Sequence, residues 1–299
     1  MKSIGFIDHY LNNFHANLYV RLIREGAYKD DLEVTCAYGE AEWQGVGTDE
    51  WCEKNGVQRL ATPAEVVAAS DCLIVLSPNN PERHLELSRE ALSSGKPCYV
   101  DKTFAPDYAT ARAMVDLAAE HGTPMFSTSA LRFAPEVHEF LGGVGVEHPA
   151  RAVAMRGPND YEVYSVHLYE PLTMLLGPGA EAMQYFGDGD FMLFSLRYPD
   201  GRLAAVNMFR PWGSIEEKSY GHPFEASVMF DCGATSFPLS MGNVFEDLVD
   251  AICRFFSGDP APAPPSDTLE IMALIETGRQ AMARPGEWIE VTPGPTAGA

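Results

Sequence analysis

Short apolar runs alternate with longer amphipathic stretches over the first 130 residues of the chain. The runs are bounded by turn residues and predict strands at residues 3–8, 32–38, 72–77, 97–101 and 124–128. The amphipathic stretches predict helices over residues 16–26, 49–56, 81–95 and 106–122. Pro106 at the start and Gly122 past the end of the last helix suit the preferences of helix termini. This alternation is typical of β-α units on a parallel sheet.

From about residue 150 the pattern changes to longer runs in which apolar and polar residues alternate. They predict strands within residues 150–157, 182–187, 191–199, 202–211 and 224–232. One helix is expected at 167–177, and two more at 245–258 and 266–286, separated by a stiff proline-rich connector. We therefore predict an α/β protein with a Rossmann-type domain at residues 1–130. An α+β domain at 131–299 follows, with a large, mostly antiparallel open sheet and a C-terminal helix that can pack back on the first domain.

Length, charge and cysteine usage narrow the class of protein. A chain of 299 residues suits two domains rather than one core. Its 42 acidic and 21 basic residues give a net charge of -21, which argues against nucleic acid or an anionic membrane as partner. The first residues run directly into a strand and no apolar stretch reaches membrane-spanning length, so we expect a cytoplasmic protein. The six scattered cysteines are expected to be reduced core residues, with no metal site.

Four local motifs resemble one known family. They are SPNNPERH (77–84), GKPCYVDKTFA (95–105), VHLYEPLTMLLG (166–177) and the closing PGEWIEV (285–291). In this order, over almost the whole chain, they are similar to motifs of the glucose-fructose oxidoreductase, inositol dehydrogenase and MocA family. The resemblance implies NAD or NADP as cofactor, a sugar, cyclitol or related polyol as small-molecule substrate, and hydride transfer as the reaction. It also implies a homodimer or homotetramer formed through the second domain's open sheet.

The resemblance places Lys102 at the family lysine, His167 at the active-site histidine and Glu170 at the acid that follows it. Hydride transfer at a carbinol needs a group that takes or gives the hydroxyl proton and a donor that stabilises the alkoxide. We expect Lys102 to be that donor and His167 its acid/base partner. Glu170 lies one helical turn from His167 and can orient the imidazole. The simpler alternatives are a solvated lysine and a capping or packing histidine.

The predicted cofactor-binding residues follow the strands of the first domain. Ser77, Pro78, Asn79 and Asp101 lie at the carboxyl ends of parallel strands, where open α/β sheets bind ligands. The glycine fingerprint G-x-G-x-x-G is missing, and Asp8, Tyr10 and Asn13 stand about where its glycines belong, followed by His15.

These side chains obstruct the usual approach of a pyrophosphate, and Asp8 adds a negative charge there. The acid expected after the second strand is also missing, unless Glu40 or Glu42 replaces it.

The candidate substrate-binding residues are Arg132, Tyr161, Tyr164 and Trp212. A structural ion pair is the alternative for Arg132, and hydrophobic packing is the alternative for the tyrosines. Two other functions compete with hydride transfer. One is a lyase, hydrolase or epimerase step on the same fold, and the other is non-catalytic binding by a protein that has lost the dinucleotide.

Overall fold

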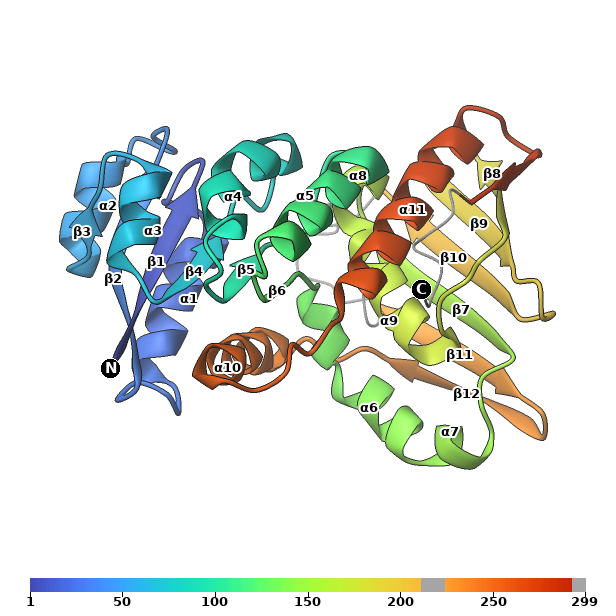
Figure 1. Cartoon of the computed structure of the whole chain (residues 1–299). Helices are drawn as coiled ribbons and strands as arrows, with labels where there is room; N and C mark the ends of the chain where they lie inside the picture. Colours follow the sequence, from blue (N-terminus) through green and yellow to red (C-terminus); the bar gives the residue numbers. More distant parts are fainter. Residues whose placement is uncertain (211–223, 292–299) are drawn as a thin grey trace. The chain divides into compact units, whose positions relative to one another are not determined.

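The computed structural model describes residues 1–210 and 224–291, which form two units (Figure 1). The first unit contains residues 1–128 and 245–268, and the second contains the other described residues. Residues 245–268 thus belong to the first unit although they follow most of the second unit in sequence. The domain boundary expected after residue 130 stays a prediction. No helix within the described ranges has the length and apolarity needed to cross a membrane.

The first unit is built on a six-stranded parallel sheet with the order β3-β2-β1-β4-β5-β6. Its strands are β1 (Lys2–Asp8), β2 (Leu32–Gly39), β3 (Gln58–Arg59), β4 (Cys72–Val75), β5 (Cys98–Val100) and β6 (Met125–Phe126). Its helices are α1 (Phe14–Glu25), α2 (Thr48–Asn55), α3 (Pro63–Ala69), α4 (His84–Leu92), α5 (Tyr108–Glu120) and α10 (Val244–Ser257). The strand order reverses between β1 and β4, and such switch points are where doubly wound sheets bind ligands. The predicted Rossmann-type sheet is confirmed.

Helices cover both faces of this sheet (Figure 1). Helices α3, α4 and α5 follow one another across one face, whereas α1 and α10 lie on the other. Helix α3 and its C-cap residue approach β1 closely at Gly5. A Cβ added there would lie 2.3 Å from Ser70 Oγ and 2.4 Å from Val66 Cγ1, so only glycine fits. The sheet core is therefore sealed on two sides, and only its edges are open to ligands.

Three local details of the first unit differ from the sequence prediction. The two-residue strand β3 was not expected. Helix α3 was not expected, although Thr62 caps it and Pro63 occupies its first turn. Helix α5 begins at Tyr108 and is capped by the Asp107 side chain, so Pro106 lies before the cap rather than at the first helical position. The cap decides the boundary because its carboxylate satisfies a helical N–H group.

The second unit contains a seven-stranded mixed sheet with the order β12-β11-β7-β10-β9-β8-β13. Its strands are β7 (Ala152–Pro158), β8 (Ala182–Gly187), β9 (Phe191–Arg197), β10 (Leu203–Phe209), β11 (Glu225–Phe230), β12 (Gly233–Pro238) and β13 (Trp288–Glu290). Its helices are α6 (Pro135–Gly142), α7 (Val144–Glu147), α8 (Tyr161–Tyr164), α9 (Val166–Leu176) and α11 (Pro265–Met282), the last of which begins in the first unit. Only β7 and β10 pair in parallel, so the predicted, mostly antiparallel sheet is confirmed.

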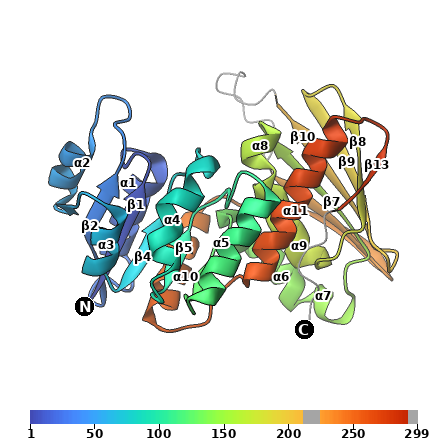
Figure 2. The same ribbon diagram turned by 45° about the horizontal axis from the view of Figure 1, so that its top comes forward.

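One face of the second sheet is covered by α9 and α11, and among the described residues no helix covers the other (Figure 2). The covered face presents buried side chains such as Met183, Tyr185 and Phe194. The alternating residues of the same strands are half-buried or exposed, as a sheet with one open face requires.

The cysteines are reduced and five of the six are buried. Cys232 is exposed in the turn between β11 and β12, so the expectation of a core residue is wrong for this position. A tight turn at an edge strand has no interior into which its side chain can fold.

Candidate functional site

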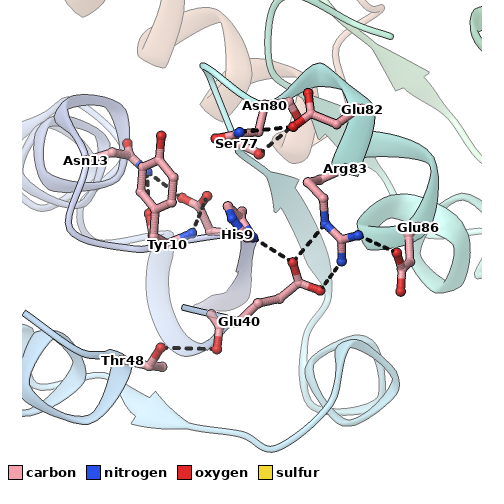
Figure 3. Close-up of polar contacts among 12 residues, drawn as sticks. His9, Tyr10, Asn13, Glu40, Thr48, Ser77, Asn80, Glu82, Arg83 and Glu86 are labelled. Carbon is pink, nitrogen blue, oxygen red and sulfur yellow. Dashed lines mark hydrogen bonds and ion pairs between the residues drawn. The ribbon is translucent and has the colours of Figure 1, made fainter. Parts of the chain in front are cut away.

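The loop between β1 and α1 is closed by its own side chains (Figure 3). Asp8 ends β1 and is fully buried, and its carboxylate accepts hydrogen bonds from the Asn13 side chain at 2.7 Å and the Tyr10 N–H at 3.3 Å. Asn13 also donates to the Tyr10 carbonyl oxygen at 2.7 Å and accepts from Ala16 N–H at 2.9 Å, which caps α1. Burial raises the pKa of Asp8 well above its usual value, against the opposing effect of these hydrogen bonds.

Aromatic stacking covers the same loop. The Tyr10 ring is 6% exposed and stacks on Trp43, with the centroids 4.7 Å apart and the planes at 15°. The Tyr10 hydroxyl is hydrogen-bonded to the side chain of Asn79, in the loop after β4. The loops that follow β1, β2 and β4 are therefore joined through one tyrosine.

Glu40 directly follows β2 and is one of the two residues that could replace the missing ribose-binding acid. Arg83 donates two hydrogen bonds to its carboxylate, at 2.6 and 3.1 Å, and His9 Nδ1 lies 2.8 Å from it (Figure 3). Partial burial raises the pKa of Glu40, but Arg83 and His9 outweigh this effect and hold it below its usual value. Glu40 is thus ionised and already engaged, whereas Glu42 is exposed.

A buried ion pair lies at the carboxyl end of β5. His15 Nδ1 and Asp101 Oδ2 are 2.5 Å apart, with side-chain exposures of 8% and 0%. Asp101 also accepts hydrogen bonds from the Lys102 N–H at 2.8 Å and the Tyr99 hydroxyl at 3.3 Å. Burial raises the pKa of Asp101, but the attraction of His15 prevails and the pKa is lowered. His15, predicted to meet the cofactor, is therefore the partner of Asp101.

Lys102 is 8% exposed and its ammonium donates to the Pro78 carbonyl oxygen at 3.2 Å. Burial lowers the pKa of Lys102, against the opposing charge of Asp101. The Ser77 backbone has a φ of 88°, which is rare for a residue with a side chain, and its hydroxyl donates to the Asn80 carbonyl oxygen at 3.2 Å. The predicted residues Ser77, Pro78, Asn79, Asp101 and Lys102 are thus brought together at the carboxyl edge of β4 and β5.

A second polar cluster lies within the second unit. Ser129 Oγ is 2.7 Å from His167 Nδ1, and the Ser129 N–H donates to Glu170 Oε2 at 3.1 Å. Glu170 also forms an ion pair with Arg132 at 2.7 Å, and both side chains are buried. Ser129 was missed by sequence reasoning. Its only signal is its capping position before the short 3-10 helix at Ala130–Phe133.

The tyrosines predicted to line a substrate have different surroundings. Tyr161 is 2% exposed, and its hydroxyl lies 3.1 Å from the Ile275 carbonyl oxygen and 3.1 Å from the Tyr169 hydroxyl. The substrate-binding prediction for Tyr161 is therefore corrected to hydrophobic packing. Tyr164 is half-buried and packs edge-on against the His167 ring at 5.3 Å. Trp212 lies outside the described residues.

Comparisons with known proteins identify the fold and one matching family model. Residues 14–128 match a family model described as an oxidoreductase family with an NAD-binding Rossmann fold, that of the glucose-fructose oxidoreductases, inositol dehydrogenases and MocA proteins. The match begins at Phe14, directly after the closed loop. No curated protein sequence matches the chain.

Several solved structures share the fold over nearly the whole chain. A scyllo-inositol dehydrogenase from Lactobacillus casei, with bound NAD(H) and scyllo-inositol, is 12% identical with a TM-score of 0.79, covering 97% of this chain and 99% of that chain. An oxidoreductase from Agrobacterium radiobacter, in complex with NAD+, L-tartaric acid and magnesium, is 13% identical with a TM-score of 0.74, covering 97% and 98%. A biliverdin reductase from Synechocystis, in complex with biliverdin and NADP+, is 12% identical with a TM-score of 0.68, covering 93% and 98%.

The fold and the matched region define a protein of the Rossmann class that is similar to NAD-binding oxidoreductases. Residues 14–128 thus match the predicted family of glucose-fructose oxidoreductases, inositol dehydrogenases and MocA proteins, and the fold is similar to that of inositol dehydrogenases over nearly the whole chain.

The first unit fits a dinucleotide at one place and not at another. Asn79, which is exposed, and Lys102 offer polar groups at the carboxyl edge of the sheet, which suits the nicotinamide end of a cofactor, whereas Ser77 and Asp101 are fully buried. At the start of α1, by contrast, Asn13 already accepts the Ala16 N–H and Asp8 fills the space beneath it. In the glycine loop a pyrophosphate binds free backbone N–H groups at the start of the helix. Here the side chains of Asp8 and Asn13 occupy that position.

The buried Arg132–Glu170 pair predicts a large effect on stability. We expect Arg132→Met to lower the free energy of unfolding by about 3–5 kcal/mol, because the Glu170 charge would stay buried without its partner. Urea unfolding monitored by circular dichroism measures this difference. The matched control is Arg156→Met, whose pair with Glu225 is largely exposed and should contribute less than about 1 kcal/mol. Equal losses in both variants would contradict the prediction.

Proposed function

We propose that the protein is an NAD(P)-dependent oxidoreductase that transfers hydride to or from a sugar, cyclitol or related polyol. The observation that carries the proposal is Lys102, a buried lysine of lowered pKa at the carboxyl edge of the sheet. The family match and the inositol dehydrogenase fold support the substrate class. When bound, the nicotinamide supplies the site that accepts or gives the hydride.

Lys102 is proposed to donate a hydrogen bond to the reacting oxygen of the substrate. Its lowered pKa lets the ammonium exchange a proton nearer neutral pH than an exposed lysine can. Asp101 keeps the ammonium charged enough to stabilise an alkoxide, and His15 holds Asp101 in place. Negative charge on the reacting oxygen would thus be stabilised by Lys102, which the buried pair of Asp101 and His15 supports.

His167 is proposed as the acid/base group that accepts the hydroxyl proton of the carbinol when it is oxidised and returns it when the carbonyl is reduced. Ser129 holds its Nδ1 atom, and Glu170 holds the main chain of Ser129. Glu170 would therefore orient the imidazole through Ser129, in addition to pairing with Arg132. Arg132 and Tyr164 are retained as candidate substrate contacts.

A second function is favoured by the closed loop at residues 8–13. A lyase, hydrolase or epimerase step needs the acid and base but not a freely exchanging dinucleotide. The loop suits such a protein because Asp8 and Asn13 occupy the usual phosphate position. Dinucleotide binding separates this alternative, and that of a non-catalytic binding protein, from the leading proposal.

Thermal melting with NAD and with NADP is the first test. A ligand that binds the native state stabilises it, so we expect the melting temperature to rise with at least one dinucleotide at millimolar concentration. No shift with either would contradict the redox proposal and favour the alternatives.

The rise in melting temperature caused by the dinucleotide should become smaller as the pH is raised. Asp8 is neutral below its raised pKa and repels phosphate once it ionises above that value. Asp8→Asn should remove this pH dependence, whereas Asp30→Asn, at an exposed position, should keep it.

Replacement of Lys102 is the second test. We expect Lys102→Ala to lower turnover by about 100-fold or more, because the reacting oxygen loses its proton donor and its stabilising charge. Absorbance of the reduced dinucleotide, followed over a panel of cyclitols and sugars, measures turnover. The matched control is Lys54→Ala on the exposed side of α2, which should retain activity. Unchanged activity in the Lys102 variant, with a normal melting temperature, would refute the role.

We also propose that two copies of the chain associate through the open face of the second sheet, either as a homodimer or as one contact within a homotetramer. The face presents Phe186, Phe191, Leu203, Met229 and Trp288, with exposures of 47, 63, 55, 53 and 43%. Residues that oppose each other on paired strands point to the same face, and so do alternate residues of one strand. Leu203 and Met229 both oppose Ala152, and Leu203 opposes Arg197, which lies on the same side of β9 as Phe191. Phe186 opposes Leu193 of β9, and Trp288 opposes Gln184, so both lie on this face as well. Exposed apolar patches of this kind mark interaction surfaces.

Leu203→Lys should convert the oligomer to monomers, because a charge buried in an apolar interface is unfavourable. Light scattering coupled to size exclusion measures the mass. Val146→Lys is the matched control, since Val146 is 67% exposed on α7, away from the sheet. A wild-type protein that is monomeric would contradict the proposal.

A further inference from the structure

Three side chains with metal-binding donors meet at one edge of the second unit. They are His148, Asp231 and Cys232, and one donor atom of each lies within 4.8 Å of the other two. His148 directly follows α7, whereas Asp231 and Cys232 form the two-residue turn between β11 and β12. The closest pair is His148 Nδ1 and Asp231 Oδ1, at 2.8 Å.

The backbone around these donors is regular. Phe230 pairs with Gly233 across the turn, so the antiparallel register holds Asp231 and Cys232 at its tip. The His148 N–H donates to the Val144 carbonyl oxygen at 3.0 Å, and its ring stacks on Phe230 with centroids 6.0 Å apart. The imidazole is therefore positioned by packing rather than by Asp231 alone.

The thiol is unusual for this chain. Cys232 is the one exposed cysteine of the six, so it has no exposed partner in the same molecule for a disulfide. Its thiol is hydrogen-bonded to Asp231, and desolvation followed by the Asp231 charge raises the pKa of Cys232. A nucleophilic cysteine needs the opposite shift, so a catalytic Cys-His pair is not supported.

We propose that His148, Asp231 and Cys232 bind a zinc ion. Imidazole, thiolate and carboxylate are the ligands that Zn²⁺ takes in proteins, and a thiolate disfavours Mg²⁺ and Ca²⁺. Tetrahedral coordination with bonds of about 2.0–2.3 Å places the donors about 3.3–3.8 Å apart, so side-chain movements of about 1 Å complete the site. Binding releases the thiol proton to solvent, and the neutral imidazole coordinates through one ring nitrogen while the other carries its proton. Three protein ligands leave one coordination position for water.

The site joins the hairpin tip of β11 and β12 to the segment after α7. A bound ion would therefore stabilise the edge of the sheet that ends in β12. This inference is independent of the proposed oxidoreductase activity, because the first unit contributes no ligand to it.

Isothermal titration of the full-length, reduced protein with Zn²⁺ tests the proposal. We expect one ion per chain, and at least about tenfold weaker binding in Cys232→Ser and in His148→Ala, since each loses a ligand. His121→Ala, at an exposed histidine of the first unit, is the matched control and should bind like the wild type. Both ligand positions lie at the surface, so the variants are expected to fold.

Titration with Co²⁺ identifies the ligand directly. A near-ultraviolet thiolate-to-cobalt absorption band should develop in the wild type and be missing in Cys232→Ser, because the other five thiols are buried. Mg²⁺ should not compete. Zn²⁺ binding that is unchanged in Cys232→Ser, or no saturable binding up to millimolar Zn²⁺, would overturn the proposal.

Discussion

Buried polar groups at the carboxyl edge of the first sheet must be paired, and this constraint organises the site. Asp8 and Glu40 end or follow the neighbouring strands β1 and β2, and Asp101 follows β5, which lies beyond β4; Asp8 and Asp101 are fully buried and Glu40 is partly buried. Each carboxylate has taken a partner from a distant part of the chain or the adjacent loop: Asn13, Arg83 and His15. A buried carboxylate without such a partner would cost several kcal/mol. The loops are therefore ordered by the hydrogen bonds and ion pairs that satisfy these carboxyl groups.

The same constraint explains why the family fold survives without its glycine loop. In the glycine loop a bound pyrophosphate satisfies the N–H groups at the start of α1. Here the Asn13 side chain satisfies one of them, and Asp8 satisfies Asn13 in turn, so the helix begins properly with no ligand. Burial at zero exposure raises the pKa of Asp8, although the hydrogen bonds from Asn13 and Tyr10 act in the opposite direction. The start of α1 is therefore satisfied by side chains of the loop itself rather than by a bound ligand.

Much of the fold could be predicted because its elements carry strong local patterns. Strand β1 is an apolar run and α10 is an amphipathic helix, and both were placed to within a residue or two. Helix α3 was missed because its seven residues are too few to show a helical repeat of apolar positions. Strand β12 was missed because it is a largely exposed edge strand with few apolar residues. Local periodicity does not detect elements that are held mainly by their neighbours.

The site was predicted less completely, because pairings between distant residues leave no trace in spacing. The positions of Lys102, Asp101 and Ser77 followed from their places at strand ends, a local property. The pairing of Glu40 with Arg83, and of Asp101 with His15, joins residues from different loops and depends on the sheet order. Tyr161 was misassigned for a similar reason: its ring fits against Gly278, where an added Cβ would lie 1.8 Å from the hydroxyl oxygen.

The cluster in the second unit shows how a buried ion pair can position a group without touching it. Glu170 is fixed by Arg132, and it accepts the N–H of Ser129, whose hydroxyl reaches His167. Removing water from Glu170 strengthens each of these contacts, because a low dielectric increases the attraction between charges and dipoles. The imidazole is half-buried, so its own contacts with solvent would allow it several orientations. The contacts that run from Arg132 through Glu170 and Ser129 limit these orientations, and such preorganisation would serve the proposed proton transfer.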